Sequence, residues 1–408
     1  MTCIVQKFGG TSLATLDLIK KAALRVKGEV EAGHTVVVVV SAMAGTTNTL
    51  VEYVSDLSTT YDRAEYDVVV SSGEQVTAGL LALSLQNLGI PARSWQGWQI
   101  PIYTSSHHAQ AKIDHIDTDL LLHDLNKGTV AVVAGFQGLS RNGRITTLGR
   151  GGSDTTAVAL AAALKAERCD IFTDVEGIYT ADPNYITTAG KLDHIAYQEM
   201  LELAAQGAKV LQRDSVELAM HNRVRLRVLS SLRDTPGTLV TSENELRATR
   251  KHISGIAHSL SHVKLTLCAL PSTLPLEEIR SLLNSQNIPL DMGHQKLFPC
   301  GTLLDFSFTV PATEERRAVE MLQTAKNKFN FRDLLRNSDV AKVSVIGSGL
   351  QTEYSPSHKL FQTLREKGIE VQAVAASDIK LSVLIAAHEA GRAISTLHTV
   401  YQLDAEEN

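Results

Sequence analysis

The sequence predicts an α/β protein, with a domain built on a mainly parallel sheet followed by two smaller units of βαββαβ type. Its 408 residues are too many for one ordinary hydrophobic core, which favours two or three domains. In residues 1–242, apolar runs alternate with glycine turns and helical patterns, as in a parallel α/β layer. After that, one pattern of strands and helices occurs twice, which indicates a weak internal repeat.

The first expected element is a strand over residues 4–8, which the pair Gly9-Gly10 interrupts. Thr11 or Ser12 can then cap a helix, whose apolar residues recur at intervals of three and four. An unbroken run of valines follows, as expected for a strand buried on both faces. The strands expected in this domain are residues 4–8, 36–40, 68–70, 130–134, 169–174 and 226–229.

The polar and basic stretch 243–262 is predicted to be a linker, within which residues 253–257 could form an edge strand. The two repeated units cover residues 263–335 and 338–403, and each is smaller than a typical free-standing domain. Units of this kind often pair edge to edge, so we expect them to associate. The acidic residues 404–408 are expected to form a solvated tail.

Composition argues against several classes of protein. The net charge of -5 disfavours a nucleic-acid binder. The four cysteines lie far apart without a C-x-x-C pair, which favours a reducing compartment and no structural zinc site. The longest apolar stretch, residues 36–43, is too short to span a bilayer, and the N-terminus lacks the features of a signal peptide. We therefore expect a cytoplasmic protein without a nucleic-acid or membrane partner.

The most informative stretch is TTLGRGGSDTT, residues 146–156. Apolar residues recur at helical spacing after it, so Ser153 or Asp154 is expected to begin a helix. Glycines before a helix start let backbone N–H groups approach an anion, and Arg150 can pair with a carboxylate or phosphate. The stretch predicts an anion site, and an ordinary capped loop with a surface arginine is the alternative.

Lys7 stands at the end of the first strand, beside a glycine turn and a helix start. This arrangement suits a phosphate, with backbone donors from the turn and one mobile cation. The segment does not match the P-loop pattern, which excludes that class of site. The alternative is a strand lysine whose ammonium group reaches solvent.

An acidic, loop-like stretch, TDVEGIYTADP over residues 173–183, follows another buried strand. It could hold a nucleotide and its metal at the carboxyl edge of the sheet. Asp182-Pro183 is equally compatible with an ordinary turn. Lys209 follows a glycine and an alanine and, taken alone, would be a surface residue.

Small side chains over residues 41–48 suit a ligand that lies against a sheet edge, and Glu74 could bind an ammonium group. Each signal is weak by itself. The histidines are dispersed along the chain. His107, His108 and His115 lie in a polar loop and are expected to be solvated.

Taken together, these segments resemble the aspartate kinases of the amino acid kinase superfamily. The motifs occur in the family's order and cover the whole first domain. TLGRGGSDT and TDVEGIYTADP are the most specific pair, because they separate aspartate kinases from relatives that act on other substrates. The matching motifs are KFGGTS (7–12), SAM (41–43), SSGEQV (71–76), GFQG (135–138), TLGRGGSDT (147–155), TDVEGIYTADP (173–183) and GAKVL (207–211).

The resemblance implies a three-layer αβα kinase domain over residues 1–242, followed by two ACT domains. It implies transfer of the ATP γ-phosphate to the β-carboxylate of L-aspartate, giving 4-phospho-L-aspartate, with Mg²⁺ bridging the nucleotide phosphates. This is the first step of lysine, threonine and methionine biosynthesis. A carboxylate with a pKa of about 4 is already ionised at neutral pH, so the reaction requires no general base. Catalysis then consists of positioning and charge neutralisation, which fits the lysines, glycines and helix starts.

The resemblance also implies roles for single residues. Lys7 would neutralise the transferring phosphoryl group, and Asp154 would orient Lys7. The residues implied in ATP binding are Lys7, Phe8, Gly9, Gly10, Thr173, Asp174, Tyr179, Asp182 and Lys209.

For the second substrate, Arg150 would clamp the α-carboxylate of aspartate and Glu74 would take its ammonium group. The other residues implied in substrate binding are Ser41, Thr47, Gly151, Gly152 and Ser153.

The sequence departs from the family pattern most clearly in the ACT-like half. The turns that often contain Pro-Gly are here PSTLP (271–275) and SGLQTEYSP (348–356), and DMGHQK (291–296) is also altered. Whether lysine or threonine binds there as an effector is therefore open, whereas a homodimer through ACT edges is expected. In the kinase half, residues 44–48 and 212–214 differ from the usual pattern without changing an implied catalytic residue.

Two other functions are possible. A kinase for glutamate or a nucleotide is disfavoured by the ACT pair and the Arg150 motif. A catalytically silent amino-acid sensor would be expected to lack Lys7, Arg150 or Asp154, all of which are present.

Overall fold

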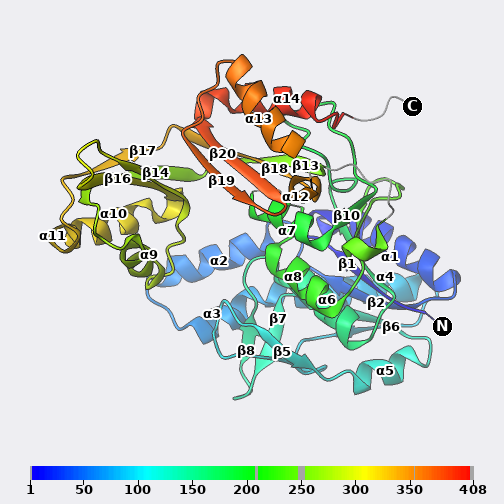
Figure 1. Ribbon diagram of the computed structural model, residues 1–408. Coiled ribbons are helices and arrows are strands. Elements are labelled where there is room, and N and C mark those ends of the chain that lie inside the picture. The colour runs from blue at the N-terminus through cyan, green and yellow to red at the C-terminus, as the bar shows by residue number, and fades with distance from the viewer. Residues whose placement is uncertain (1, 207–209, 247–252, 353, 405–408) are drawn as a thin grey trace. The chain divides into compact units, whose positions relative to one another are not determined.

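The computed structural model describes residues 2–206, 210–246, 253–352 and 354–404. The chain forms two compact units (Figure 1). One segment, Tyr179–Gly190, interrupts the first unit and belongs to the second. The first unit consists of Met1–Ile178, Lys191–Ala204 and Lys209–Ala248, and the second of Tyr179–Gly190, Ala205–Ala208 and Thr249–Asn408.

An eight-stranded sheet with the strand order β10-β12-β11-β9-β1-β2-β6-β3 forms the centre of the first unit. Neighbouring strands are parallel except β11 and β12, which confirms the predicted mainly parallel sheet. The strands are β1 (Cys3–Phe8), β2 (Thr35–Val40), β3 (Ala92–Trp95), β6 (Val130–Ala134), β9 (Arg168–Thr173), β10 (His194–Ala196), β11 (Leu226–Ser230) and β12 (Thr238–Thr241).

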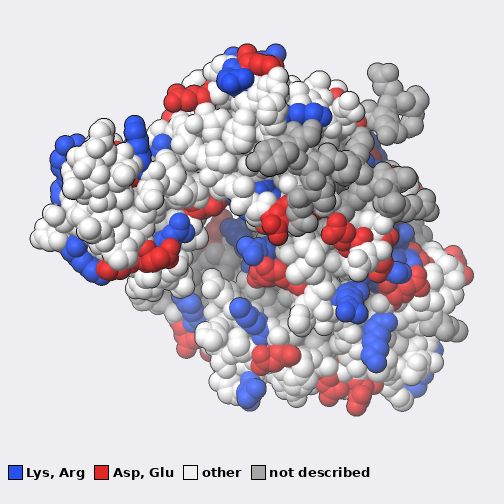
Figure 2. Space-filling view, in the orientation of Figure 1, with Lys and Arg blue, Asp and Glu red and all other residues white. Residues whose placement is uncertain are grey.

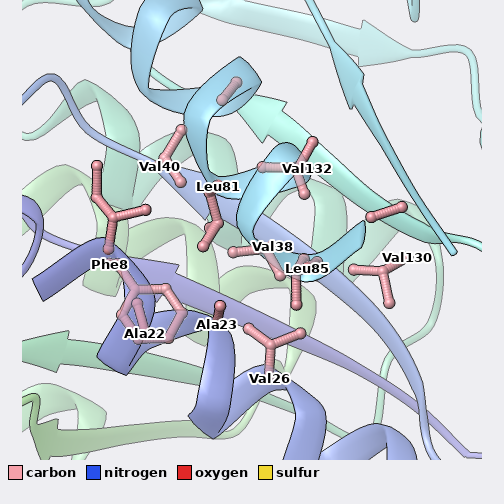
Figure 3. Packing of buried hydrophobic residues seen from close by; sticks show 14 of the residues in the cluster. Phe8, Ala22, Ala23, Val26, Val38, Val40, Leu81, Leu85, Val130 and Val132 are labelled. Atoms are coloured by element: carbon pink, nitrogen blue, oxygen red, sulfur yellow. The ribbon is translucent and has the colours of Figure 1, made fainter. Parts of the chain in front are cut away.

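Helices cover both faces of this sheet, so the unit has the expected three layers (Figure 1). On one face, α1 (Leu16–Glu31) and α4 (Ser72–Asn87) pack against alternate strand residues such as Val38 and Val132 (Figure 3). From the other face, α6 (Gly152–Ala163) contacts β1, β2 and β9, and α8 (Arg213–Asn222) contacts α6. Burial on both faces explains why these strands consist almost entirely of apolar residues.

A second, four-stranded sheet in the first unit has the order β5-β4-β7-β8 and was not predicted. Its strands are only three or four residues long, so they carry little periodic signal. The strands are β4 (Ile102–Thr104), β5 (Ile113–Ile116), β7 (Gln137–Ser140) and β8 (Ile145–Thr147). The remaining helices of eight residues or more that begin in this unit are α2 (Thr46–Leu57), α3 (Arg63–Val70) and α7 (Tyr197–Ala205).

Two local predictions were wrong. Residues 68–70 form the last turn of α3 rather than a strand. Asp62 caps this helix by accepting a hydrogen bond from Ala64 N at 2.7 Å, and a good cap outweighs the small helix penalty of valine. The N-cap of α1 is Thr15 rather than Thr11 or Ser12, because residues 11–13 form a separate 3₁₀ turn.

Helices α3 and α4 follow each other almost without a break, and Arg63–Asn87 is the one helical stretch among the described residues that is long and apolar enough to cross a membrane. Half of its most apolar window is buried inside the protein. Leu81 and Leu85 of α4 belong to the core that Figure 3 shows, so this composition is that of a core helix.

In the second unit, the first of two antiparallel sheets has the order β15-β16-β14-β17, and its elements follow one another as βαββαβ. This confirms the first predicted ACT-type unit. Its core includes Leu265, Phe306 and Phe308 from the strands and Ile279 and Leu322 from the helices. The elements are β14 (His262–Pro271), α9 (Leu276–Asn284), β15 (Asp291–Leu297), β16 (Leu303–Pro311), α10 (Glu315–Thr324) and β17 (Asp333–Asn337).

The other sheet has the order β13-β18-β20-β19, and its edge strand β13 (Gly255–Ser259) precedes the whole first sheet in the sequence. Part of the predicted linker 243–262 is therefore a strand, which pairs antiparallel with β18. In the sequence, the first βαββαβ unit is inserted between β13 and the other three strands of this sheet. The other strands of this sheet and the longer helices that accompany it are β18 (Val340–Ile346), α13 (Tyr354–Glu366), β19 (Ala373–Ser377), β20 (Lys380–Ala386) and α14 (Ala390–Val400).

Charged side chains of both signs lie next to one another over the face that Figure 2 draws. Many form exposed ion pairs within one helix, such as Arg213 with Glu217 at 2.8 Å. Pairs of this kind contribute little to stability, about 0–1 kcal/mol each. Stability is therefore expected to come mainly from the buried clusters described above.

Candidate active site

Lys7 and Asp154 form a buried ion pair at the carboxyl edge of the large sheet. Lys7 is the penultimate residue of β1, and Asp154 lies in the first turn of α6. Lys7 Nζ and Asp154 Oδ1 are 2.5 Å apart, and the two side chains are 11% and 10% exposed. The pair therefore holds a cation in a fixed position beside a helix N-terminus, where an anion is favoured.

The turn that follows β1 is packed against the segment that follows β2. Gly9 N donates a hydrogen bond to Phe172 O at 3.1 Å, and Ala44 N donates to Gly10 O at 3.2 Å. A Cβ atom at Gly10 would lie 2.8 Å from the carbonyl oxygen of Ala42. A side chain at position 10 would therefore clash with the backbone of Ala42. The turn beside Lys7 is held by its hydrogen bonds to Phe172 and Ala44.

Phe8 differs from its neighbours in the motif because its side chain belongs to the hydrophobic core. It is fully buried in the core that Figure 3 shows. Its ring stacks on that of Phe172, with the ring centroids 4.6 Å apart. Alternation along the strand turns it to the face opposite Lys7. A role of Phe8 in ATP binding would therefore not involve its ring.

Glu74 is a second buried charge at this edge. It lies in the first turn of α4 and is 3% exposed. Its Oε1 accepts a hydrogen bond from Ala42 N at 3.1 Å, whereas Oε2 has no hydrogen-bond partner among the described residues. Burial raises the pKa of Glu74 to about 7, in spite of the bond from Ala42. A carboxylate with one unpaired buried oxygen is a suitable acceptor for the ammonium group of a ligand.

The glycine-rich stretch forms the turn into α6, as predicted. Gly151 has a φ of +71°, in the left-handed region that favours glycine. A Cβ atom at Gly152 would lie 2.8 Å from the ring of Phe136, so this glycine is also required by space. Ser153 is buried in the helix start, whereas Arg150 is exposed. The guanidinium group of Arg150 is thus accessible to an anionic ligand.

Ser41 and Thr47 follow β2 at the same edge of the sheet. Both are half-buried, and Thr47 lies in the first turn of α2, which begins after Gly45 at a φ of +85°. The residues predicted to bind aspartate are therefore all in the first unit: Ser41 and Thr47 follow β2, Glu74 lies at the start of α4, and Arg150 to Ser153 follow β8 of the small sheet.

The predicted nucleotide residues are divided between the two units. Thr173 ends β9 in the first unit, and its hydroxyl donates to Asp174 Oδ1 at 3.1 Å. The carbonyl oxygen of Thr173 accepts hydrogen bonds from Ser231 N at 2.8 Å and Ser231 Oγ at 3.0 Å. These two residues follow the strand next to β1, whereas Lys209 lies outside the described residues.

Tyr179 and Asp182 belong to the segment Tyr179–Gly190 of the second unit. Asp182 Oδ1 accepts a hydrogen bond from Asn184 N at 2.9 Å, which is the turn chemistry that an Asp-Pro sequence favours. The segment is anchored by apolar side chains. Ala181, Ile186 and Ala189 are buried in the core that also contains residues of β18 and β20.

Thr180 fixes this segment through hydrogen bonds on all sides. Its buried hydroxyl donates to Leu403 O at 2.8 Å, accepts from Gly190 N at 3.0 Å and lies 2.9 Å from His398 Nε2. Its carbonyl oxygen accepts from Ile256 N of β13 at 2.7 Å. The second half of the acidic stretch is thus built into the second unit.

One buried group near the site was missed by the sequence analysis. Asp67 of α3 is fully buried and accepts hydrogen bonds from Ala109 N at 3.0 Å and Thr147 Oγ1 at 2.5 Å. His108 Nδ1 lies 2.6 Å from its Oδ2. The prediction that His108 is solvated was therefore wrong, whereas His107 is exposed as expected. The available signal for this buried carboxylate was an acidic residue next to a run of apolar residues, as in EYDVVV (65–70).

Among the residues that the structure describes, no group of three or more His, Cys, Asp or Glu side chains is arranged to hold a metal ion. Magnesium in phosphoryl-transfer sites is commonly held by one or two carboxylates together with the phosphates of the substrate. Asp174, which is exposed after β9, is a carboxylate available for such a role.

The chain is similar in sequence to known proteins over nearly all of its length. Residues 2–230 match the amino acid kinase family, and residues 343–401 match the ACT domain. An aspartate kinase of Stutzerimonas stutzeri is 43% identical over 406 residues, which cover 99% of this chain and 98% of the relative. An aspartokinase of Pseudomonas aeruginosa is 44% identical over 407 residues, with the same coverage of both chains.

Solved structures agree with this likeness. Aspartokinase III of Escherichia coli, crystallised with aspartate and ADP, has a TM-score of 0.79 and 27% identity, covering 97% of this chain and 99% of that chain. The same enzyme with lysine and aspartate has a TM-score of 0.75 and 27% identity, covering 98% and 99%.

Proposed function

The chain belongs to the aspartate kinases of the amino acid kinase family, and on this premise we propose how its residues carry out the reaction. The reaction is transfer of the ATP γ-phosphate to the β-carboxylate of L-aspartate, which gives 4-phospho-L-aspartate. The observation that carries the proposal is the buried pair of Lys7 and Asp154 beside the glycine turn and the start of α6.

Lys7 would neutralise the charge that spreads over the phosphoryl oxygens during transfer, and backbone N–H groups of the Gly9–Gly10 turn would add donors. Asp154 acts through Lys7, because its carboxylate holds the ammonium group in place at 2.5 Å. The attacking β-carboxylate is ionised at neutral pH, so Asp154 need not accept a proton.

Aspartate would be held at its two ends. Arg150 supplies a planar fork for the α-carboxylate, and Glu74 Oε2 supplies the unpaired acceptor for the ammonium group. The half-buried hydroxyls of Ser41 and Thr47 lie at the same edge. The helix start formed by Gly151, Gly152 and Ser153 would complete the pocket.

ATP would be bound by Thr173 and Asp174 after β9, by Tyr179 and Asp182, and by Lys209. Asp174, an exposed carboxylate after β9, would hold a Mg²⁺ ion that enters with the nucleotide, and this ion would supply positive charge to the phosphates. Its chemistry adds to the neutralisation by Lys7.

We further propose a kinase domain over residues 1–242 and a cytoplasmic homodimer that associates through its ACT domains, 263–335 and 338–403, with β13 added to the second. The enzyme would serve lysine, threonine and methionine biosynthesis. The E. coli structure with lysine supports an amino-acid effector, lysine or threonine, although the ACT loops of this chain differ in sequence from the usual pattern.

Formation of the acyl phosphate, trapped as the hydroxamate, tests this function. The assay contains ATP, Mg²⁺ and L-aspartate, with L-glutamate as the control acceptor and with lysine or threonine added in separate arms. ATP-dependent product from aspartate alone is expected. Nucleotide binding without any product would instead favour a catalytically silent sensor.

A further inference from the structure

Asp67 is a buried carboxylate for which the reaction described above has no use. It lies on α3, is fully buried and faces donors from two other segments. Thr147 Oγ1 and Ala109 N donate to Oδ1 at 2.5 Å and 3.0 Å, and His108 Nδ1 lies 2.6 Å from Oδ2. A buried carboxylate is costly unless it is fully hydrogen-bonded, so these contacts are strong constraints on the three segments.

We propose that Asp67 is a positioning residue for the aspartate pocket, which fixes the Arg150 turn relative to the helix that carries Glu74. This inference rests on the proposed roles of Arg150 and Glu74 in binding aspartate. Asp67 itself would not touch the substrate.

Asp67 is connected to the Arg150 turn through Thr147 and the loop that contains His108. Thr147 is the last residue of β8, three positions before Arg150. Its carbonyl oxygen accepts a hydrogen bond from Ala111 N at 2.9 Å, so the loop that contains His108 is bound to the same strand end. A Cβ atom at Gly149 would lie 3.3 Å from Ala109 O, which shows how closely this loop packs on the turn. Asp67 thus holds both the strand before the turn and the loop beside it.

Asp67 is connected to Glu74 through the junction of α3 and α4. Ser71 N donates to the carbonyl oxygen of Asp67 at 3.1 Å, and α4 begins at the next residue. Gln137 Nε2 of β7 donates to Ser71 O at 3.0 Å, which ties the junction of α3 and α4 to the small sheet. A shift of α3 would therefore move the start of α4, where Glu74 lies. The contacts of Asp67 connect the residues proposed for the two ends of aspartate and do not involve β1 or β9.

The test compares Thr147→Val with Thr147→Ser. Valine has nearly the same shape but lacks the hydroxyl that donates to Asp67, whereas serine keeps it. A hydrogen bond to a charged group corresponds to about a tenfold effect or more. We expect Thr147→Val to raise the aspartate KM about tenfold, with kcat and the ATP KM changed less than about twofold, and Thr147→Ser to restore the wild-type value.

His108→Gln and His107→Gln form a second matched pair, since His108 contacts Asp67 and His107 is exposed. Only His108→Gln is expected to raise the aspartate KM. Equal rises in the KM values of aspartate and ATP, or no change in Thr147→Val, would overturn the inference while the wild-type activity upheld the proposed function. A wild-type protein inactive with aspartate would overturn both.

Discussion

The residues proposed to bind aspartate and those proposed to bind ATP are built into the molecule in different ways. The residues proposed for aspartate, such as Ser41, Glu74 and Arg150, all belong to the first unit. The acidic stretch for ATP is divided, because Thr173 and Asp174 follow β9 whereas Tyr179 and Asp182 are anchored in the second unit. If these assignments hold, we expect changes in the core of the second unit to alter ATP binding through Tyr179 and Asp182, and aspartate binding to respond only to changes within the first unit.

The largest effect is expected where both substrates meet, at Lys7. Lys7→Ala should lower kcat by about 10³-fold, because a fixed cation at the developing charge is lost. It also leaves Asp154 buried without a partner, which destabilises the fold. The double variant Lys7→Met with Asp154→Asn removes both charges and serves as the control for folding, measured by urea denaturation. Wild-type kcat in either variant would contradict the role of Lys7.

Arg150→Ala tests whether Arg150 binds aspartate rather than ATP. Loss of a charged, fork-shaped partner should raise the aspartate KM about 100-fold and leave the ATP KM nearly unchanged. Arg141→Ala is the matched control, since Arg141 is an exposed arginine between β7 and β8. Steady-state kinetics with each substrate varied in turn measures both constants. A larger change in the ATP KM than in the aspartate KM would refute this assignment.

Glu74 should give aspartate binding a dependence on pH. Burial raises its pKa to about 7, so the carboxylate is neutral below that pH and charged above it. Only the charged form attracts an ammonium group, so kcat/KM for aspartate should fall about tenfold per pH unit below 7, at saturating ATP. Glu74→Gln should be less active at high pH and should lose this dependence. A profile with the same slope in both proteins would exclude Glu74 as its source.

The smallest effect is expected on the ATP side, from Thr180 in the second unit. Thr180→Val removes a buried hydroxyl that bonds Leu403 and Gly190, which should lower the free energy of unfolding by about 1–3 kcal/mol. Looser anchoring of Tyr179 and Asp182 should raise the ATP KM a few-fold without changing the aspartate KM. Thr180→Ser keeps the hydroxyl and should behave like the wild type. A change in the aspartate KM of Thr180→Val would contradict the expectation that this segment affects ATP binding alone.

The sequence predicted the parts of the fold that local patterns determine. The valine-rich strands of the large sheet were predicted because strands buried on both faces consist of consecutive apolar residues. The glycine turn into α6 was predicted because the residues that begin a helix are recognisable within a few positions of the sequence. The partner of β13 could not be predicted, since Gly255 pairs with Ile346 and no local signal connects them. Residues 68–70 were misjudged because a valine run fits a strand and a capped helix equally well.

The residues of the candidate site were proposed from sequence motifs and their roles stay predictions, whereas the buried residues that hold these segments in place were not foreseen. Asp67 and His108 interact across a separation in sequence that motif spacing does not reveal. In the same way, the stretch from Thr173 to Asp182 is continuous in the sequence, so its division between two units could not be inferred from spacing.

The insertion of one ACT-type sheet after β13 has a consequence for the order in which the chain folds during synthesis. Strand β13 leaves the ribosome before the whole inserted sheet, yet its partner β18 follows that sheet. At about 5–20 residues per second, β13 waits several seconds with its backbone groups unpaired. The segment from Tyr179 to Gly190 waits longer still, because Leu403 is one of its anchors. In the growing chain, the segment Tyr179–Gly190 therefore stays without its final anchors until Leu403 has been synthesised.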